Sequence, residues 1–267
     1  MIKKIGIVGG SGYTGGELIR ILINHPNVEI DFVYSRTNDG KKILDVHSDL
    51  IGKDLPLFSK KINKNIDVIF LCLGHGNSSK FLKENSFSKK TVIIDLSNDF
   101  RLKSNNSFKD FNFVYGLPEL KRENIKKAKA IANPGCFASL LQLALLPLAE
   151  NGLLKEEIHA NATTGSTGAG VGMSETSHFS WRNNNLSWYK AFNHQHLDEI
   201  IENIKFSKIN LIPQRGNFTR GIFLTCYTKF KYDLNYAKKI FENYYKDEPF
   251  TIISKNEITL KQVINTN

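Results

Sequence analysis

The apolar positions in the first part of the chain alternate between strand-like and helix-like segments. Lys3 to Val8 is an apolar, β-branched run, which is typical of a buried strand. After a glycine-rich stretch, Glu17 to Asn24 carries apolar residues at helical spacing, and Val28 to Tyr34 predicts a second strand. This order of strand, glycine turn, helix and strand indicates the start of a doubly wound sheet.

The alternation continues along the chain and then changes character after Asn133. Asp67 to Leu73 and Thr91 to Leu96 predict two more buried strands, with helical sequence between them at Ser78 to Glu84. Phe137 to Glu150 predicts one long, largely buried helix. The strands and helices expected after it are Ile158 to Thr163, Leu197 to Ile204, Gly221 to Phe230 and Leu234 to Tyr245.

These patterns predict an α/β protein with two domains. Residues 1–140 are expected to form an N-terminal Rossmann-type doubly wound parallel sheet with helices on both faces. Residues 141–267 are expected to form a second, α+β domain.

The composition is that of a globular protein. At 267 residues and 41% hydrophobic, the chain can bury a sizeable core and is too apolar for a disordered polymer. Its best candidate for a membrane span, Ala138 to Ala149, is too short, and glycine interrupts the N-terminus before a signal-like segment forms. Three widely spaced cysteines argue against a disulfide framework. We therefore expect a cytoplasmic protein with no membrane partner.

The net charge of +10 raises the question of nucleic-acid binding. The lysines are scattered, and the densest group, Lys121 to Lys129, contains no aromatic residue and matches no nucleic-acid-binding motif. We interpret that group as a solvated helix face and expect no nucleic-acid partner. Surplus positive charge equally suits small anionic ligands, phosphates above all.

A glycine pattern lies directly between the first strand and the first helix. Gly9, Gly12 and Gly15 are spaced as in a dinucleotide-binding turn, where a side chain would hold the backbone away from a pyrophosphate. The start of the following helix contributes unpaired N–H groups and a favourable dipole. The residues expected to bind a dinucleotide here are Gly9, Ser11, Gly12, Tyr13, Thr14 and Gly15.

The end of the second strand indicates which dinucleotide binds. An NAD site usually places an acidic residue there, which accepts a hydrogen bond from the ribose 2′-hydroxyl. Here Tyr34 is followed by Ser35 and Arg36, and Asp31 lies earlier, within the strand. Because a hydroxyl followed by a guanidinium suits a 2′-phosphate, we expect NADP.

Cys136 is the candidate nucleophile. It follows Asn133 to Gly135 and opens the helix Phe137 to Glu150, where unpaired N–H groups and the helix dipole stabilise a thiolate. Cys72 and Cys226 lie inside predicted strands, where cysteine behaves as a small apolar residue. A buried cysteine with no catalytic role is the alternative for Cys136.

A thiol nucleophile needs a general base nearby. His194 and His196 stand two residues apart just before a predicted helix, and their spacing does not choose between them. A His-x-His pair also occurs in metal sites, but no further Cys, His or acidic cluster accompanies it, so no metal is expected. His75, after the third strand, is expected at the cofactor with a positional role.

Several blocks of the sequence together resemble the N-acetyl-γ-glutamyl-phosphate reductase family, which is related to aspartate-semialdehyde dehydrogenase. The blocks are Gly9 to Gly15, Ile94 to Leu102, Val114 to Glu119, Asn133 to Phe137, Gly165 to Gly170, His194 to His196 and Thr219 to Gly221. They occur in the family's order through the whole chain, and taken jointly they are highly specific.

The resemblance implies an NADPH-dependent acyl-phosphate reductase of arginine biosynthesis. Cys136 would attack the acyl phosphate and expel phosphate, and the resulting thioester would be reduced to N-acetylglutamate semialdehyde. One histidine would act as base for the thiol and as acid for the sulfur, and the resemblance favours His194, with His196 close behind.

The resemblance also implies the substrate contacts and the assembly. Arg101 would clamp the phosphate, Asn133 would line the substrate site, and Arg220 would bind a substrate carboxylate. The second domain would carry catalysis and dimerisation, in a homo-oligomer that is a dimer or a tetramer. Family members continue past Asn267 with a further strand and a long helix, so we expect the second domain to be truncated there.

Other functions stay open at this point. The same chemistry would suit an N-succinyl-glutamyl or an aminoadipyl phosphate, because these substrates differ only at the pocket wall. A non-catalytic NADP-binding remnant is a further alternative, against which Cys136, the paired histidines and Arg101 argue.

Overall fold

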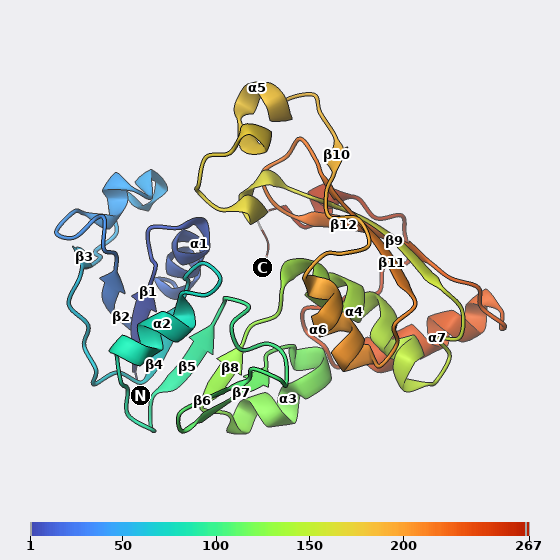
Figure 1. Cartoon of the computed structure of the whole chain (residues 1–267), viewed down its shortest axis with the longest axis horizontal. Helices are drawn as coiled ribbons and strands as arrows, with labels where there is room; N and C mark the ends of the chain where they lie inside the picture. The colour runs from blue at the N-terminus through green and yellow to red at the C-terminus, as the bar shows by residue number, and fades with distance from the viewer. Residues whose placement is uncertain (1, 265, 267) are drawn as a thin grey trace. The chain divides into compact units, whose positions relative to one another are not determined.

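The chain folds into two compact units, Met1–Pro134 and Gly135–Asn267 (Figure 1). The structure is a computed structural model and describes residues 2–264 and residue 266. It confirms the α/β class, with a doubly wound parallel sheet in unit 1 and mixed strands and helices in unit 2. The boundary expected after residue 140 lies inside a helix, Cys136–Glu150, that belongs wholly to unit 2. Asn267, where truncation is expected, lies outside the described residues.

Unit 1 is built on an eight-stranded sheet in the order β3-β2-β1-β4-β5-β8-β7-β6. Neighbouring strands run parallel, except that β6 and β7 are antiparallel. The strands are β1 (Lys3–Val8), β2 (Val28–Tyr34), β3 (Phe58–Ser59), β4 (Val68–Leu71), β5 (Val92–Asp95), β6 (Ser107–Phe108), β7 (Phe111–Tyr115) and β8 (Ala130–Ala132). The helices are α1 (Tyr13–Leu22), α2 (Ser78–Glu84) and α3 (Pro118–Lys127), with short 3-10 turns at Ile43–Asp45 and Ser48–Leu50.

Two element ends differ from the expected ones. Helix α1 begins at Tyr13 rather than Glu17, because the helix starts inside the glycine turn with Gly12 as its N-cap. Cys72, expected inside a strand, follows the last residue of β4, although its N–H still donates to the carbonyl of Val8 at 2.8 Å.

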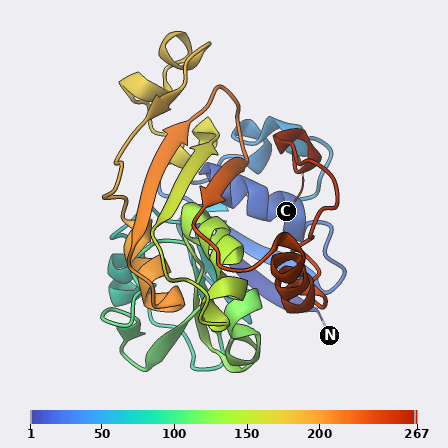
Figure 2. The ribbon, with the colours of Figure 1, turned by 90° about the vertical axis from the view of Figure 1, so that its right-hand side faces the viewer.

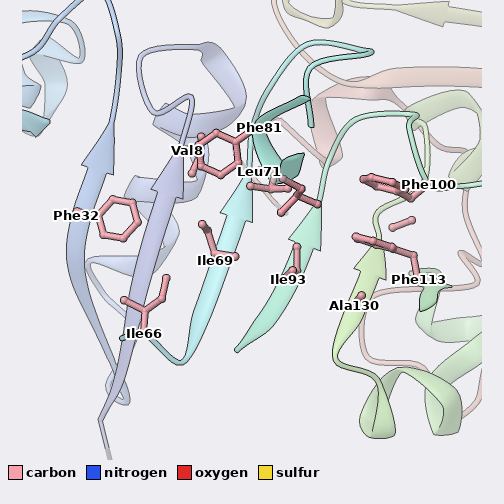
Figure 3. Close-up of a cluster of buried hydrophobic side chains, with 12 residues drawn as sticks. Val8, Phe32, Ile66, Ile69, Leu71, Phe81, Ile93, Phe100, Phe113 and Ala130 are labelled. Atoms are coloured by element: carbon pink, nitrogen blue, oxygen red, sulfur yellow. The ribbon is translucent and has the colours of Figure 1, made fainter. Parts of the chain in front are cut away.

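Both faces of the unit 1 sheet are buried, which explains the continuous apolar sequence of β1. Ile5 and Ile7 pack in one hydrophobic cluster with Ile19 of α1. Val8 packs in a second cluster, which includes Phe81 of α2 (Figure 3). A strand buried on both sides needs an apolar residue at nearly every position, so its sequence is continuously apolar and does not alternate between apolar and polar residues.

Unit 2 contains a four-stranded mixed sheet in the order β10-β11-β9-β12 (Figure 2). Strand β9 (Ile158–Thr164) pairs parallel with β11 (Ile209–Arg215) and antiparallel with β12 (Ile222–Tyr227), and β10 (Ser187–Trp188) is antiparallel to β11. The helices are α4 (Cys136–Glu150), α5 (Phe179–Arg182), α6 (His196–Ile204) and α7 (Leu234–Tyr245), with 3-10 turns at Ser166–Ala169, Glu175–Ser177 and Leu260–Gln262. The sequence did not predict β11, because Pro213 removes a strand donor from its middle.

Helices cover one face of this sheet and leave the other open. Along β9, Ile158, Ala160 and Ala162 are buried, whereas His159 and Asn161 between them are partly exposed. Helix α4 packs against β12, α6 and α7, which places the helices on the buried face. Among the described residues, no helix is both long and apolar enough to cross a membrane.

Candidate active site

The glycine turn after β1 is packed so closely that side chains have no room. Gly9 has φ +82°, and a Cβ there would overlap the carbonyl of Cys72. A Cβ on Gly15 would lie 2.6 Å from the Cα of Gly10. The N–H groups of Gly9 and Gly10 both donate to the carbonyl of Tyr34, at 3.0 and 3.2 Å. The turn therefore packs against the ends of β2 and β4, and its glycines present backbone atoms rather than side chains.

Helix α1 begins directly after this turn. Gly12 is the N-cap, in extended conformation, and the first turn contains no acidic residue. Tyr13 and Thr14 are exposed. The first N–H groups of a helix have no acceptor within the helix, so this terminus suits an anion such as a pyrophosphate.

Hydroxyl and amide groups gather where β2 ends. The Ser35 hydroxyl is buried and lies 3.2 Å from the Ser11 hydroxyl of the glycine turn. Arg36 and Thr37 are exposed beside it, and the Asn38 amide donates to the Thr37 hydroxyl at 3.2 Å. Ser35, which the sequence predicts at the cofactor, thus lies next to the glycine turn, and Arg36 follows it in the chain. Asn38, whose amide also donates to the Ser35 hydroxyl, was not predicted.

The other expected residues of unit 1 hold loops together at the ends of β4, β5 and β8. His75 is exposed, and its Nδ1 accepts the N–H of Asn98 at 3.2 Å. Arg101 is only 6% exposed and donates to the carbonyls of Leu96, at 3.1 Å, and Asn133, at 2.8 Å. These hydrogen bonds hold the Arg101 side chain against the carbonyls of Leu96 and Asn133.

In unit 2, Cys136 is the first residue of α4, and its side chain is exposed. Gly135 is the N-cap, in extended conformation, and its carbonyl accepts the N–H of Ser139 at 2.8 Å. The first turn of α4 contains no acidic residue, so nothing on the helix opposes the effect of its dipole on a thiolate.

His194 and His196 lie against the residues on either side of Cys136. The centroids of their two rings are 4.5 Å apart. The centroid of the Phe137 ring lies 5.2 Å from that of His194 and 6.1 Å from that of His196. The imidazole of His196 also fills the space where Gly135 would carry a Cβ. The structure therefore brings together the three residues that the sequence selected for catalysis.

A buried carboxylate, Glu199, ties this group together. Its Oε2 accepts the N–H of Gly135 at 3.0 Å, and its Oε1 lies 3.9 Å from Nε2 of His196. The sequence missed Glu199, although its position three residues after His196 in a predicted helix places both on one face.

Comparison with known proteins identifies the family to which the chain belongs. Two family models match the chain: the semialdehyde dehydrogenase NAD binding domain over residues 4–128 and the semialdehyde dehydrogenase dimerisation domain over residues 136–267. N-acetyl-γ-glutamyl-phosphate reductase of Christiangramia forsetii is 57% identical over 270 residues, which cover 99% of this chain and 83% of that protein. The reductase of the same name from Flavobacterium johnsoniae is 56% identical over the same shares. The chain belongs to the N-acetyl-γ-glutamyl-phosphate reductase family.

Solved structures of lower identity have the same fold. Aspartate semialdehyde dehydrogenase II from Vibrio cholerae has a TM-score of 0.65 at 16% identity, covering 91% of this chain and 79% of that chain. Aspartate semialdehyde dehydrogenase with NADP from Candida albicans has a TM-score of 0.63 at 18% identity, covering 90% and 76%. These two structures therefore share the fold of this chain.

Two further family blocks of the reductase lie against each other in unit 2. The N–H of Gly165 donates to the carbonyl of Gly221 at 3.0 Å, and a Cβ on Gly165 would lie 2.5 Å from the carbonyl oxygen of Thr219. Arg220, between these residues, is half-buried and donates through Nη2 to the carbonyl of Thr266 at 3.3 Å.

The three cysteines differ in how burial affects them. Burial raises the pKa of Cys72 to about 12 and that of Cys226 to about 11, so both remain protonated thiols at neutral pH. Cys136, by contrast, is exposed at a helix start. This contrast supports an apolar packing role for Cys72 and Cys226.

Burial determines the charge of His194. Burial, aided by the nearby charge of Lys190, lowers the pKa of His194 from 6.5 to about 4. His194 is therefore neutral at physiological pH, and its Nδ1 accepts the N–H of His196 at 3.2 Å. In the neutral ring the proton then lies on Nε2.

The lowered pKa of His194 predicts a loss of stability in acid. Between about pH 6.5 and about 4, the unfolded chain binds a proton at His194 that the folded chain does not bind. We expect this to lower the free energy of unfolding by about 2 kcal/mol as the pH falls through that window. Urea unfolding of the wild type and of His194→Asn at several pH values measures it, since the variant lacks this proton site. Parallel pH profiles for the two proteins would contradict the assignment.

Proposed function

We propose that the chain reduces N-acetyl-γ-glutamyl phosphate to N-acetylglutamate semialdehyde with release of phosphate, as a step of arginine biosynthesis. The observation that carries this proposal is the group in unit 2: an exposed Cys136 at a helix start beside His196 and the buried Glu199. Relatives named for this reaction that are 56–57% identical to the chain support the substrate.

Cys136 acts as the nucleophile. The thiolate at the start of α4 attacks the acyl carbon, the bond from that carbon to the phosphate oxygen breaks, and inorganic phosphate leaves with the electron pair. The product of this step is a thioester on Cys136. The dipole and the first N–H groups of α4 stabilise the thiolate before the attack.

His196 is the acid and base, and His194 positions it. The His196 ring lies against Gly135, next to the nucleophile, and the Glu199 carboxylate 3.9 Å away stabilises a positive charge on that ring. His194 accepts the backbone N–H of His196 and is kept neutral by burial. The geometry therefore favours the second histidine, whereas the resemblance alone favoured the first.

The residues of unit 1 fit NADP. The glycine turn, where a Cβ on Gly9 or Gly15 has no room, and the start of α1 would hold the pyrophosphate. Ser11, Ser35 and Arg36 would hold the 2′-phosphate. Asp31, the acidic residue of β2, accepts a hydrogen bond from the Asn63 amide at 3.0 Å, so it is not left to bind a ribose hydroxyl as in an NAD site. The bound cofactor supplies the hydride that reduces the thioester carbonyl. His75 would lie beside it as a positional residue.

Three residues expected at the substrate take distinct roles. Arg220 would bind a carboxylate of the substrate. Arg101 would act through Asn133, whose carbonyl it holds at 2.8 Å, and so position the segment that leads into Cys136. Asn133 itself lies three residues before the nucleophile and would line the substrate site.

A homodimer would form through the open face of the unit 2 sheet. The match to a dimerisation domain over residues 136–267 supports assembly. On this face, Phe223 and Tyr227 of β12 are 38% and 60% exposed, and Phe192 beside them is 61% exposed. A hollow of about 290 Å³ lies there, lined by His159, Ala160, Asn161, Phe192, Asn210, Ile212 and Tyr227. A second copy would bury these aromatic rings, which favours association.

A cytoplasmic location suits this enzyme. None of the three cysteines, all within the described part of the chain, forms a disulfide, and a reactive thiol needs a reducing compartment.

Substitutions of Cys136, His196 and His194 are expected to lower activity to different extents. In the reverse direction, NADP reduction with N-acetylglutamate semialdehyde should require phosphate and should vanish in Cys136→Ser. His196→Asn should lower kcat about 100-fold or more, and His194→Asn distinctly less, because only His196 moves a proton. Spectrophotometric rates at saturating substrates measure this. Full activity of Cys136→Ser would overturn the mechanism, and the reverse order of the two histidine variants would return the role to His194.

A change at the 2′-phosphate site is expected to act on one cofactor only. Arg36→Ala should raise KM for NADPH by about 10-fold or more and leave KM for NADH unchanged, because only NADPH carries the charged group that the guanidinium binds. Initial rates with each cofactor measure it, with Lys126→Ala on the exposed side of α3 as the control. Equal effects on the two cofactors would show that Arg36 does not read the 2′-phosphate.

A charge on the open sheet face is expected to break the dimer. Thr225 is exposed in the middle of β12, so Thr225→Arg would place a guanidinium against its partner and weaken association by about 100-fold or more. Sedimentation velocity over a concentration series measures the dissociation constant. Asn243→Arg, at an exposed position of α7 on the helix-covered side of the sheet, is the control. A Thr225→Arg protein that dimerises like the wild type would place the interface elsewhere.

A further inference from the structure

A pair of arginines in unit 2 lies without an acidic partner. Arg182, at the end of α5, is 5% exposed, and its Nη1 donates to the carbonyl of Arg215, the last residue of β11, at 2.5 Å. Among the described residues, neither guanidinium forms an ion pair with an Asp or a Glu. Burial and the neighbouring charge of Arg215 both lower the pKa of Arg182. Two like charges therefore lie close together with nothing to balance them.

The two arginines use their donors differently. The N–H groups of Arg182 are taken up by the carbonyls of Thr176, Asn185 and Arg215 and by the hydroxyl of Ser187. Arg182 is thus a structural residue of the segment between β9 and β11. Arg215 donates through Nη1 to the Thr176 hydroxyl at 3.3 Å, and its buried Nε–H has no hydrogen-bond partner among the described residues. A buried donor on a charged group is costly to leave unpaired.

Arg215 lies next to the catalytic group. Its guanidinium lies over the ring of Tyr189, 5.0 Å from the ring centre. The Tyr189 ring in turn contacts the rings of Phe137, at 6.5 Å, and His194, at 5.9 Å. Burial raises the pKa of Tyr189, and the charge of Cys136 acts in the same direction, so the phenol and the thiol are electrostatic neighbours. Tyr189 therefore lies between the positive charge of Arg215 and the residues around Cys136, where the acyl group would react.

We propose that Arg215 binds an oxyanion of the substrate. The inference rests on the proposed function and names a substrate contact for it. The planar guanidinium of Arg215 has an unpaired Nε–H, and a guanidinium matches a carboxylate or a phosphate group through paired hydrogen bonds. Three groups on the substrates under consideration have this chemistry: the departing phosphate, the α-carboxylate, and the terminal carboxylate that an N-succinyl group has and an N-acetyl group lacks. Arg101 donates to backbone carbonyls and Arg220 is proposed above for one carboxylate, so Arg215 would be a further guanidinium that meets an oxyanion beside Cys136.

The test compares binding and turnover in the same set of proteins. Calorimetric titration with inorganic phosphate, N-acetylglutamate and N-succinylglutamate is done on the wild type, Arg215→Met, Arg215→Lys and the control Lys231→Met, whose side chain is exposed in the loop before α7. We expect Arg215→Met to lose about 10- to 100-fold in affinity for at least one probe, Arg215→Lys to lose less, and Lys231→Met to match the wild type.

The probe that is lost identifies the group. Weaker phosphate binding, with a raised KM for phosphate in the reverse reaction, assigns the departing phosphate. An equal loss of affinity for N-acetylglutamate and N-succinylglutamate would show that Arg215 binds the α-carboxylate. A loss of affinity for N-succinylglutamate alone would show that Arg215 binds the carboxylate of the succinyl group. If Arg215→Met, with a thermal unfolding midpoint like that of the wild type, binds all three probes as the wild type does, the proposal is overturned. It is also overturned if the wild type binds none of them at millimolar concentration.

The proposed function fails separately from this inference. A wild type that does not reduce NADP with N-acetylglutamate semialdehyde and phosphate would overturn the acetylated substrate, while the titrations would still report on Arg215.

Discussion

The hydrogen bond from the Gly135 N–H to the Glu199 carboxylate, at 3.0 Å, joins the starts of α4 and α6, the helices that carry Cys136 and His196. Glu199 is only 3% exposed, and a buried carboxylate is tolerated only when donors or positive charges meet it. One of its oxygens takes the N–H just before Cys136, and the other lies 3.9 Å from His196. A single side chain of α6 therefore contacts both the start of α4 and the ring of His196.

The same constraint explains why glycine precedes Cys136. The imidazole of His196 occupies the space that a Cβ would need, so any larger residue would push the ring away or displace the helix start. Glycine here allows close packing and not a special backbone conformation, because its φ of −68° is ordinary. The cysteine is exposed at a point where the surrounding structure is tightly packed.

Two helix starts would serve the two halves of the proposed chemistry. Helices α1 and α4 each begin at a glycine N-cap with no acidic residue in the first turn. The first suits a pyrophosphate and the second a thiolate, and in both cases the unpaired N–H groups and the dipole favour negative charge. The two sheets differ in a way that matches their tasks: unit 1 buries both faces, whereas unit 2 leaves aromatic side chains exposed on one face.

Local sequence determined the elements and the residues that carry the chemistry. Strand β1, the glycine turn, α1 and β2 follow from periodicity and glycine spacing over neighbouring residues, and Cys136 is marked by the helix that it opens. Strand β11 was not predicted, since Pro213 disrupts its pattern and only its pairing with β9 identifies it. The environments of Glu199, Tyr189 and Arg215 were also beyond the sequence, because each depends on contacts with segments far along the chain: Glu199 with Gly135, Tyr189 with Phe137, Arg215 with Thr176. The sequence by itself thus determined which chemical groups the protein has, while only the tertiary structure decided which of them meet, because burial, hydrogen bonding and charge act through space.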